Sequence, residues 1–349
     1  YIGQHLSSFL EGKGYDVIPL GRDLFKEDCF DELCRCVESC EVVINLAGAS
    51  INKRWTEAYK QELYDSRICV TRQLVHAINT RSVKLELFIS ASAVGYYPAF
   101  GEYDEYHDCR GMDFLARLCG VWEEEASACS SGVRLVITRF GVVLSEDGGA
   151  LKEMLRLQRF SRVSVVIGNG QQRFPWISLF DLCRSFGYII RNRQMRGVVN
   201  LVSPDLITQK QLAHTLARAD KIRRIIPLPK FFFRLKFGEG ASFVTKGQTV
   251  HPSKLQESGF TYIYPTIEKL MNITDHHTVP ELDVKRYMGR WYEIARYENH
   301  FERGMTDVTA TYTLLPDGKI RVENEGYKGG VHKKATGRAK QPDPKNNPG

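Results

Sequence analysis

The sequence of 349 residues has no run of 18 apolar residues, so we predict no membrane-spanning helix within it. It also lacks a strong charge of either sign, because 48 basic and 41 acidic residues leave a formal net charge of +7. That balance gives no indication of a nucleic-acid partner. Hydrophobic residues make up 43% and charged residues 26%, which excludes a mainly disordered chain. At about 150 residues a domain, the length corresponds to roughly two domains.

Cysteine is absent after Cys183, and the cysteines up to that point number nine, an odd count. This distribution favours reduced thiols in the cytosol over a disulfide framework. Cys34, Cys36 and Cys40 lie close enough together to suggest metal ligands. Because apolar residues around them recur at helical spacing and no histidine is near, we interpret them as part of an amphipathic helix and predict no metal site.

Strands and helices alternate along the first 145 residues. Strands are predicted at residues 16–20, 41–47, 85–90 and 133–139, and helices near residues 2–11, 28–38, 56–74 and 113–129. Such alternation requires crossover connections between parallel strands. It therefore predicts an α/β fold of the Rossmann type, with a doubly wound parallel sheet and helices on both faces.

The pattern changes twice further along the chain. Beyond residue 145 the alternation weakens, which predicts a smaller mixed lobe. From Thr274 aromatic residues alternate with polar ones, and Asp317-Gly318 between two such runs predicts an antiparallel hairpin. We therefore divide the chain into a nucleotide-binding domain at 1–145, a second lobe at 146–271, a linker at 272–277 and an antiparallel β segment at 278–349.

A dinucleotide site is indicated near the start of the chain. Tyr1-Ile2-Gly3 leads directly into the first predicted helix, as the last glycine of a phosphate-binding loop does. The first strand and earlier glycines of such a unit are missing. Gly21-Arg22 follows the strand predicted at 16–20, where an acidic residue would bind the ribose of NAD and an arginine suits the extra phosphate of NADP. A surface arginine in a turn is the alternative.

Several longer motifs follow in order along residues 1–271. They are Asn45-Leu46-Ala47-Gly48-Ala49, the run from Ser90 to Tyr97, Gly141-Val142-Val143-Leu144, Pro175-Trp176-Ile177 and Asn200-Leu201-Val202-Ser203-Pro204. Together they closely resemble the epimerase-like, extended branch of the short-chain dehydrogenase/reductases, including its C-terminal domain of unknown function.

This resemblance implies a site for NADP, with NAD less favoured. Gly3 would lie under the pyrophosphate, and Gly21 and Arg22 would hold the adenosine phosphate. The other implied contacts are Leu46 and Ala47 on the adenine-ribose side, Glu62 and Arg67 from the long helix, and Val143 near the nicotinamide. Core packing is the alternative role for the three apolar residues in that set.

The resemblance also implies where catalysis would occur. The wider superfamily uses a serine and a Tyr-x-x-x-Lys pair on one helix, in which the lysine lowers the tyrosine pKa. Ser92 matches the serine, but Leu115 and Cys119 stand at the tyrosine and lysine positions. Tyr96 or Tyr97 could supply a phenol, and we take Ser92 and Tyr96 as the catalytic candidates. The departure weighs against the usual hydride-transfer epimerisation and leaves nucleotide binding intact.

The segment at 278–349 carries a G-x-W motif formed by Gly289 and Trp291. With its flanking run at 282–296 it resembles the bacterial lipocalins. The resemblance implies that Gly289 lets a short helix enter the first strand closely, that Trp291 plugs the closed end, and that the complete barrel binds a small apolar ligand. The segment can supply three or four of eight strands, so we predict an open, incomplete barrel with an exposed edge.

The leading interpretation is an NADP-binding, epimerase- or reductase-like protein of unknown substrate, fused to a lipocalin that would bind an apolar ligand or lipid. One alternative is a non-catalytic nucleotide sensor, which the missing Tyr-Lys pair favours. The other is a lipid-handling protein with a vestigial reductase domain. We further expect a small-molecule substrate, no nucleic-acid partner and a cytoplasmic location.

Overall fold

The computed structural model describes residues 1–349 except for 82–83, 273–282, 293–304 and 340–349. It divides into two compact units, Tyr1–Thr274 and Asp275–Gly349. Each unit has its own secondary structure and is considered by itself. Within the described ranges, no helix combines the length and the apolar character that crossing a bilayer requires.

The first unit is built on a parallel sheet of four strands in the order β1-β2-β4-β8. The strands are β1 (Val42–Asn45), β2 (Leu87–Ala93), β4 (Arg134–Phe140) and β8 (Gly197–Leu201). Nearly every side chain of β2 is buried, as expected of a central strand covered on both faces. Because the strands are parallel, their carboxyl ends share one edge, where doubly wound folds bind ligands.

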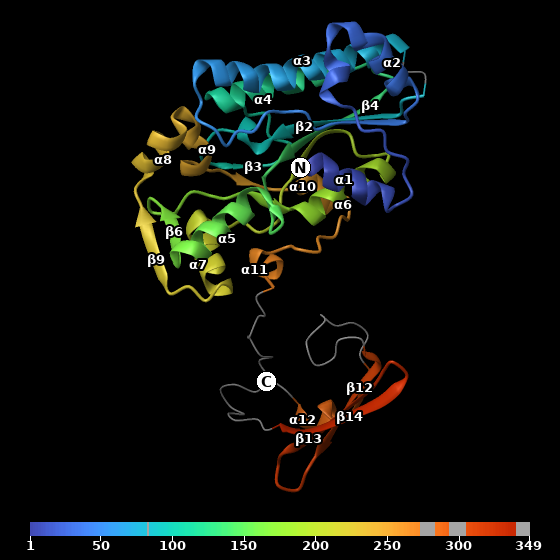
Figure 1. Ribbon diagram of the computed structural model, residues 1–349, viewed down its shortest axis with the longest axis vertical. Helices are drawn as coiled ribbons and strands as arrows, with labels where there is room; N and C mark the ends of the chain where they lie inside the picture. Colours follow the sequence, from blue (N-terminus) through green and yellow to red (C-terminus); the bar gives the residue numbers. More distant parts are fainter. Residues whose placement is uncertain (82–83, 273–282, 293–304, 340–349) are drawn as a thin grey trace. The chain divides into compact units, whose positions relative to one another are not determined.

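Helices cover both faces of this sheet (Figure 1). One face carries α1 (Ile2–Glu11) and α6 (Leu179–Arg191), whose apolar side chains share a core with β2 and β8. The other face carries α2 (Phe30–Glu38), α3 (Glu57–Arg81) and α4 (Phe114–Ser127). The arrangement confirms the predicted Rossmann-type fold. Cys34 is buried on α2, as the helical interpretation of the cysteine cluster requires.

The strand predicted at 16–20 is wrong, because these residues have no regular secondary structure. Val17 nevertheless packs on the core beneath α1. In the usual doubly wound order, the strand that precedes the first helix lies in the middle of the sheet. Its two neighbours correspond in this chain to the 16–20 segment and to β1. Among the described residues, no strand pairs with this segment.

The rest of the first unit is a smaller mixed lobe, as predicted. It contains the parallel pairs β5 (Val142–Ser145) with β7 (Trp176–Ser178) and β6 (Val163–Ile167) with β9 (Arg224–Leu228), and β10 (Thr249–Val250) pairs with β3 (Glu102–Tyr103). Its helices are α5 (Gly149–Ser161), α7 (Gln209–Ala219), α8 (Lys230–Phe237), α9 (Ser242–Thr245), α10 (Ser253–Glu257) and α11 (Ile267–Leu270). Short 3-10 helices lie at Arg22–Phe25, Glu27–Cys29, Val94–Tyr96 and Glu239–Ala241. Trp176 lies fully buried in the core of the lobe.

The second unit is an antiparallel sheet in the order β11-β12-β13-β14. A short helix, α12 (Val284–Tyr287), leads into β11 (Gly289–Tyr292), which pairs with β12 (Met305–Leu314), followed by β13 (Ile320–Lys328) and β14 (Val331–Ala339). The predicted turn at Asp317-Gly318 joins β12 to β13, and Gly318 takes a φ of 77° that favours glycine. The four strands confirm the antiparallel segment expected from the sequence.

Candidate functional site

Two residues predicted to contact the cofactor, Gly3 and Leu46, lie close together where α1 begins. A Cβ atom placed on Gly3 would lie 4.0 Å from Leu46 Cδ1. Leu46 and Val143 both pack against the core that α1 covers. The first turn of α1 carries no acidic residue, and no side chain caps its start. The free backbone N–H groups there suit an anion, so the residues present fit the pyrophosphate end of a dinucleotide.

Arg67 on α3 holds the loop that follows β1. Its Nη2 donates to the Ala49 carbonyl at 3.0 Å, and its Nη1 donates to the Leu63 carbonyl at 3.1 Å. A Cβ atom on Gly48 would lie 2.9 Å from the Arg67 Cζ, so glycine is what lets the guanidinium pass so close to the loop. Burial lowers the pKa of Arg67 below its usual value. The structure thus gives Arg67 a positioning role, while its contact with a nucleotide stays a prediction.

The remaining predicted cofactor residues lie on the surface or in loops. Gly21 and Arg22 are exposed at the start of a 3-10 helix, and Glu62 is exposed on α3. The Ala47 N–H donates to Asn45 Oδ1 at 3.1 Å, which fixes the turn after β1 at the carboxyl edge of the sheet. A nucleotide contact for each of these residues stays a prediction.

Ser92 is buried and joined to a buried ion pair. Its Oγ donates to Glu123 Oε1 at 2.6 Å. Arg139 donates to the same carboxylate from Nε at 2.8 Å and from Nη2 at 2.7 Å. The side chains of Arg139 and Glu123 are only 5% and 10% exposed, so both charges have left water. Such a pair persists only because each charge satisfies the other.

Sequence reasoning missed Glu123 and Arg139 as members of this site. One signal was available, because Arg139 lies near the end of a strand that is otherwise mostly apolar. A charged residue in a buried strand needs a partner. The register places Arg139 directly opposite Ser92 on the neighbouring strand, which no pattern along a single segment could reveal.

Tyr96 lies on the other side of Arg139. The Arg139 Cζ is 3.5 Å from the centroid of the Tyr96 ring and 4.8 Å from that of Tyr97. Burial raises the pKa of Tyr96, and the opposing effect of Arg139 does not cancel this rise. The Tyr96 phenol therefore keeps its proton at neutral pH. It can donate a proton or a hydrogen bond, but it cannot serve as a base.

Leu115 and Cys119 on α4 face the same stretch of chain. A Cβ atom on Gly95 would lie 2.5 Å from Leu115 Cδ2, so the two residues are in close contact. Burial, followed by the nearby Glu123 carboxylate, raises the pKa of Cys119 to about 12. The assignment of these residues to the tyrosine and lysine positions stays a prediction. Neither side chain can supply the proton chemistry of a Tyr-Lys pair.

An open groove of about 580 Å³ lies beside the ion pair. It is lined by side chains from α4, from the loop after β3 and from the edge of the sheet, including Tyr96, Asp108, Arg110, Glu124, Ile137 and Val198. Arg139 and Glu123 border it as well. A second cavity, lined by Arg173 and Gln248, holds only about 10 Å³ and is too small for a substrate. The groove therefore borders the ion pair, whereas Ser92 lies behind it and is not among the lining residues.

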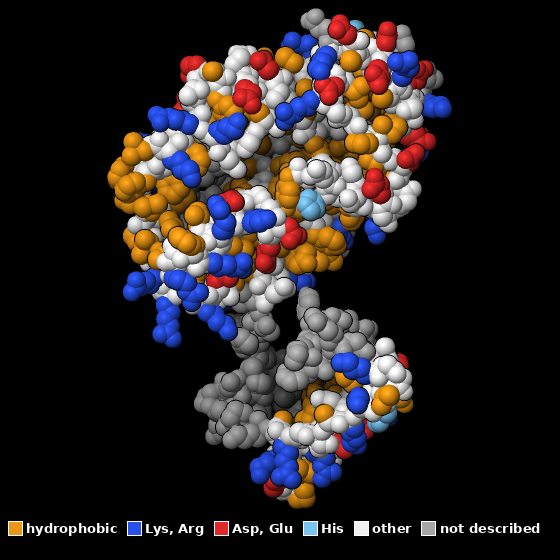
Figure 2. All heavy atoms as spheres, in the orientation of Figure 1, with side chains coloured by type: hydrophobic (Ala, Val, Ile, Leu, Met, Phe, Trp, Pro, Cys, Tyr) orange, Lys and Arg blue, Asp and Glu red, His pale blue; other side chains and the backbone are white. Residues whose placement is uncertain are grey.

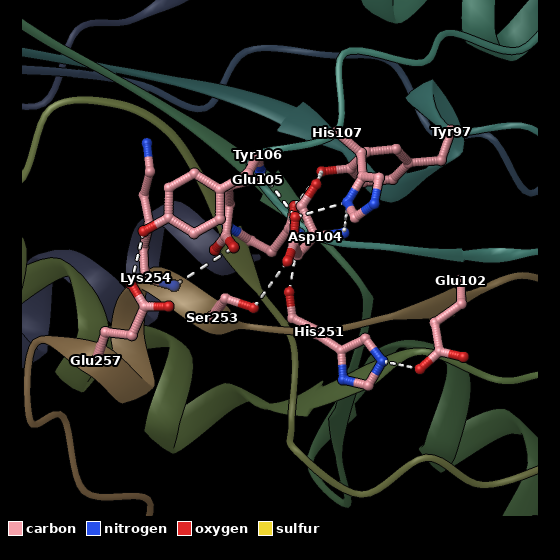
Figure 3. Close-up of polar contacts among 11 residues, drawn as sticks. Tyr97, Glu102, Asp104, Glu105, Tyr106, His107, His251, Ser253, Lys254 and Glu257 are labelled. Carbon is pink, nitrogen blue, oxygen red and sulfur yellow. Dashed lines mark hydrogen bonds and ion pairs between the residues drawn. The ribbon is translucent and has the colours of Figure 1, made fainter.

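A second polar cluster ties the loop after Tyr97 to the segment around α10 (Figure 3). Its contacts are His251 Nε2 to Glu102 Oε1 at 2.5 Å, His107 Nδ1 to Asp104 Oδ1 at 2.7 Å, Ser253 Oγ to Asp104 Oδ2 at 3.2 Å, and Tyr106 Oη to Glu257 Oε2 at 2.6 Å. The Tyr97 hydroxyl donates to the Asp104 carbonyl at 2.9 Å. The cluster therefore helps to hold Tyr97 against Arg139.

The lipocalin residues lie in the second unit. Gly289 takes a φ of 121° between α12 and β11, a backbone conformation that favours glycine. The Trp291 side chain is 49% exposed, and its Nε1 donates to the Tyr287 carbonyl at 2.9 Å. Tyr292 is also exposed, whereas Ile294 lies outside the described residues. Trp291 is thus not buried as a plug in this sheet, and ligand binding stays a prediction.

Family models match three stretches of the chain. Residues 1–201 match the NAD dependent epimerase/dehydratase family, and residues 228–272 match a domain of unknown function, DUF1731. Residues 282–348 match the lipocalin-like domain. The first match covers more than half of the chain and includes the whole region around α1, Ser92 and Arg139.

Relatives with the same family name cover most of the first unit. The epimerase family protein of Staphylococcus saprophyticus is 38% identical over 235 residues, which are 66% of this chain and 78% of the relative. The solved human epimerase family protein SDR39U1 with NADPH is 32% identical, with a TM-score of 0.72 over 78% of this chain and 94% of the human chain. The solved nucleoside-diphosphate sugar epimerase of Corynebacterium glutamicum is 26% identical, with a TM-score of 0.62 over 78% of this chain and 55% of the other. The chain therefore belongs to the NAD-dependent epimerase/dehydratase family and carries a lipocalin-like segment after it.

Proposed function

We propose that the first unit binds NADP(H) and acts as an epimerase- or reductase-like enzyme on a small molecule. The observation that carries the proposal is the close approach of Leu46 to Gly3 in the first turn of α1, against a core that Val143 also contacts. The human relative solved with NADPH supports NADP over NAD. So does Arg22, an exposed cation that follows the 16–20 segment, where the adenosine phosphate would lie.

The chemistry that this chain could perform differs from that of a Tyr-Lys enzyme. Bound NADPH would supply a hydride to a substrate carbonyl. Tyr96 holds its proton and would donate it to the carbonyl oxygen, and the guanidinium of Arg139 beside its ring would stabilise the phenolate that remains. The Ser92 hydroxyl donates to Glu123, and its oxygen would accept a hydrogen bond from a substrate hydroxyl.

A non-catalytic nucleotide sensor is the second candidate. The observation that favours it is the pair Leu115 and Cys119, which occupy the positions of the usual tyrosine and lysine without ionising near neutral pH. Oxidation of NADPH in the presence of a panel of aldehydes, ketones and keto-sugars distinguishes the two. Turnover with any member supports the enzyme, and tight nucleotide binding without turnover across the panel supports the sensor.

Titration of nucleotide fluorescence tests cofactor choice. We expect NADPH to bind about 10- to 100-fold more tightly than NADH, the size of one charge-assisted contact. Arg22→Ala should remove most of this preference, whereas Lys26→Ala, which removes a nearby exposed cation paired with Asp23, should keep it. Equal affinities in the unaltered protein, or an unchanged preference in Arg22→Ala, would contradict the proposal.

The second unit and the location of the protein complete the proposal. The exposed ring of Trp291 lies in the segment that matches the lipocalin-like domain, which supports an apolar ligand for the complete domain.

All nine cysteines are free, which supports a reducing compartment such as the cytosol. Counting thiols in the denatured, unreduced protein tests the location, and four disulfides with one free thiol would contradict it.

A further inference from the structure

The helix α8 turns large apolar side chains toward solvent. Phe231, Phe232 and Leu235 are 53%, 46% and 65% exposed. Phe233 and Phe237, which lie on the opposite side of the helix, are half-buried. Apolar side chains of this size are usually covered, and a contiguous group of them indicates a surface that meets a partner.

The same stretch is strongly basic. Residues 221–238 contain no acidic residue and six cations, namely Lys221, Arg223, Arg224, Lys230, Arg234 and Lys236. The acidic residues that bound the stretch are already paired, Asp220 with Arg159 at 2.9 Å and Glu239 with Lys60 at 2.5 Å. The two acidic residues that flank the stretch in sequence are therefore already paired with cations outside it.

The apolar character extends from α8 along β9 toward α5. Ile226 on β9 is 46% exposed, and Phe160 in the last turn of α5 is 91% exposed. Val163, which follows that turn, pairs with Arg224 at the start of β9. Phe160 therefore precedes the end of the β6-β9 pair at which the basic residues of β9 lie. Figure 2 shows hydrophobic side chains gathered over α8 and basic side chains over the end of β9 that lies away from α8. Both groups are on one flank of the first unit.

We propose that this flank, the basic surface formed by residues 221–238 with Phe160, docks onto an anionic lipid surface. Exposed rings next to lysine and arginine suit such a surface, because the rings enter the boundary of the acyl chains while the cations reach the headgroup phosphates. A membrane offers negative charge over the whole 221–238 stretch at once. A neutral protein partner would leave six cations without counter-charge, and an acidic protein partner is an outcome that the test separates.

Vesicle flotation with the whole purified protein tests this proposal. We expect binding to phosphatidylcholine vesicles that contain about 30% phosphatidylserine, little binding to pure phosphatidylcholine, and a strong decrease with salt. Arg234→Gln with Lys236→Gln should lower the partition coefficient about 25-fold, at roughly fivefold for each cation lost. Phe232→Ser with Leu235→Ser should lower it at least tenfold while leaving the charge unchanged.

A matched control separates this surface from net charge alone. Lys13→Gln with Lys84→Gln removes two exposed cations from distant parts of the same unit and should change binding less than threefold. Equal loss in this control, equal binding to neutral and anionic vesicles, or no vesicle binding would each overturn the proposal. So would binding to a soluble acidic protein that the anionic vesicles do not displace. Circular dichroism and NADPH binding, which these exposed substitutions should leave unchanged, show that each variant is folded.

Discussion

Arg139 on β4 and Glu123 on α4 form a two-point ion pair inside the first unit, with Nε and Nη2 of the arginine 2.8 and 2.7 Å from the two carboxylate oxygens. The pair connects β4, a strand of the sheet, to α4, a helix that covers one face of the sheet. It also connects the two catalytic candidates, because Ser92 donates to the carboxylate and Tyr96 stacks on the guanidinium. The stability of the first unit and the proposed chemistry therefore depend on the same two charged side chains.

Removing the carboxylate should strongly destabilise the first unit. Glu123→Ala leaves Arg139 as an unpaired buried cation, and we expect the free energy of unfolding to fall by about 3–5 kcal/mol in urea denaturation. Glu123→Leu with Arg139→Met should recover much of that loss, because no charge then remains buried. Arg193→Gln breaks an exposed ion pair with Glu86 and should change the free energy of unfolding by less than about 1 kcal/mol. A small effect of Glu123→Ala would show that water reaches the pair.

Ser92 should matter to turnover more than Cys119 does. Ser92→Ala removes the hydroxyl that would accept a hydrogen bond from substrate, so we expect kcat on a substrate found in the panel to fall about tenfold or more. Cys119→Ala removes a thiol whose high pKa keeps it neutral, and kcat should change less than about twofold. Both variants should keep their affinity for NADPH. The opposite ranking would show that the thiol takes part in catalysis.

The sequence predicted those features that repeat along a single segment. The helix predicted near residues 2–11 is observed at Ile2–Glu11, and the hairpin at Asp317-Gly318 follows from its turn residues. The segment at 16–20 failed because a strand depends on its neighbours, and periodicity describes only the segment itself. The partnership of Glu123 with Arg139 was hidden for the same reason, since it depends on how α4 crosses β4.

Acid should weaken the polar cluster around Asp104. Burial raises the pKa of this carboxyl, but hydrogen bonds from the Tyr106 N–H, His107 and Ser253 outweigh it, so the pKa lies below the ordinary 3.8. A carboxyl with a lowered pKa in the folded state contributes stability above its unfolded pKa and loses it as the pH falls through the folded value. The difference in stability between the unaltered protein and Asp104→Asn should therefore be full at about pH 5.5 and shrink toward about pH 3.

Urea denaturation at several pH values measures this difference. Asp16→Asn removes an exposed carboxylate outside the cluster and serves as the matched control. The stability difference for this control should stay small and should not show the same decrease. A difference for Asp104→Asn that grows as the pH falls would mean that the carboxyl is protonated in the folded protein and that the cluster holds it as a neutral group.

The second unit should be far less resistant to proteases than the first. Among its described residues no hydrophobic side chain is fully buried, and Trp291 and Tyr292 are 49% and 70% exposed. Burial contributes about 25 cal/mol for each Å² of apolar surface, while ordering costs about 1–2 kcal/mol per residue. An open sheet of this kind cannot offset that cost by itself. The first unit should resist cleavage because its core, including Trp176 and Phe186, lies wholly before residue 272.

Limited proteolysis should therefore trim the chain to about Leu270 and leave a fragment that binds NADPH as the intact protein does. Mass spectrometry of the products and nucleotide titration of the trimmed protein measure both halves of this expectation. Adding further strands of an eight-stranded barrel should protect the second unit and allow it to bind a fatty acid, because Trp291 would then have an opposing wall to pack against. A protease-resistant fragment of 278–349 that binds fatty acid without added strands would contradict the prediction and would mean that the sheet closes by another route, such as pairing of its exposed edges between two copies.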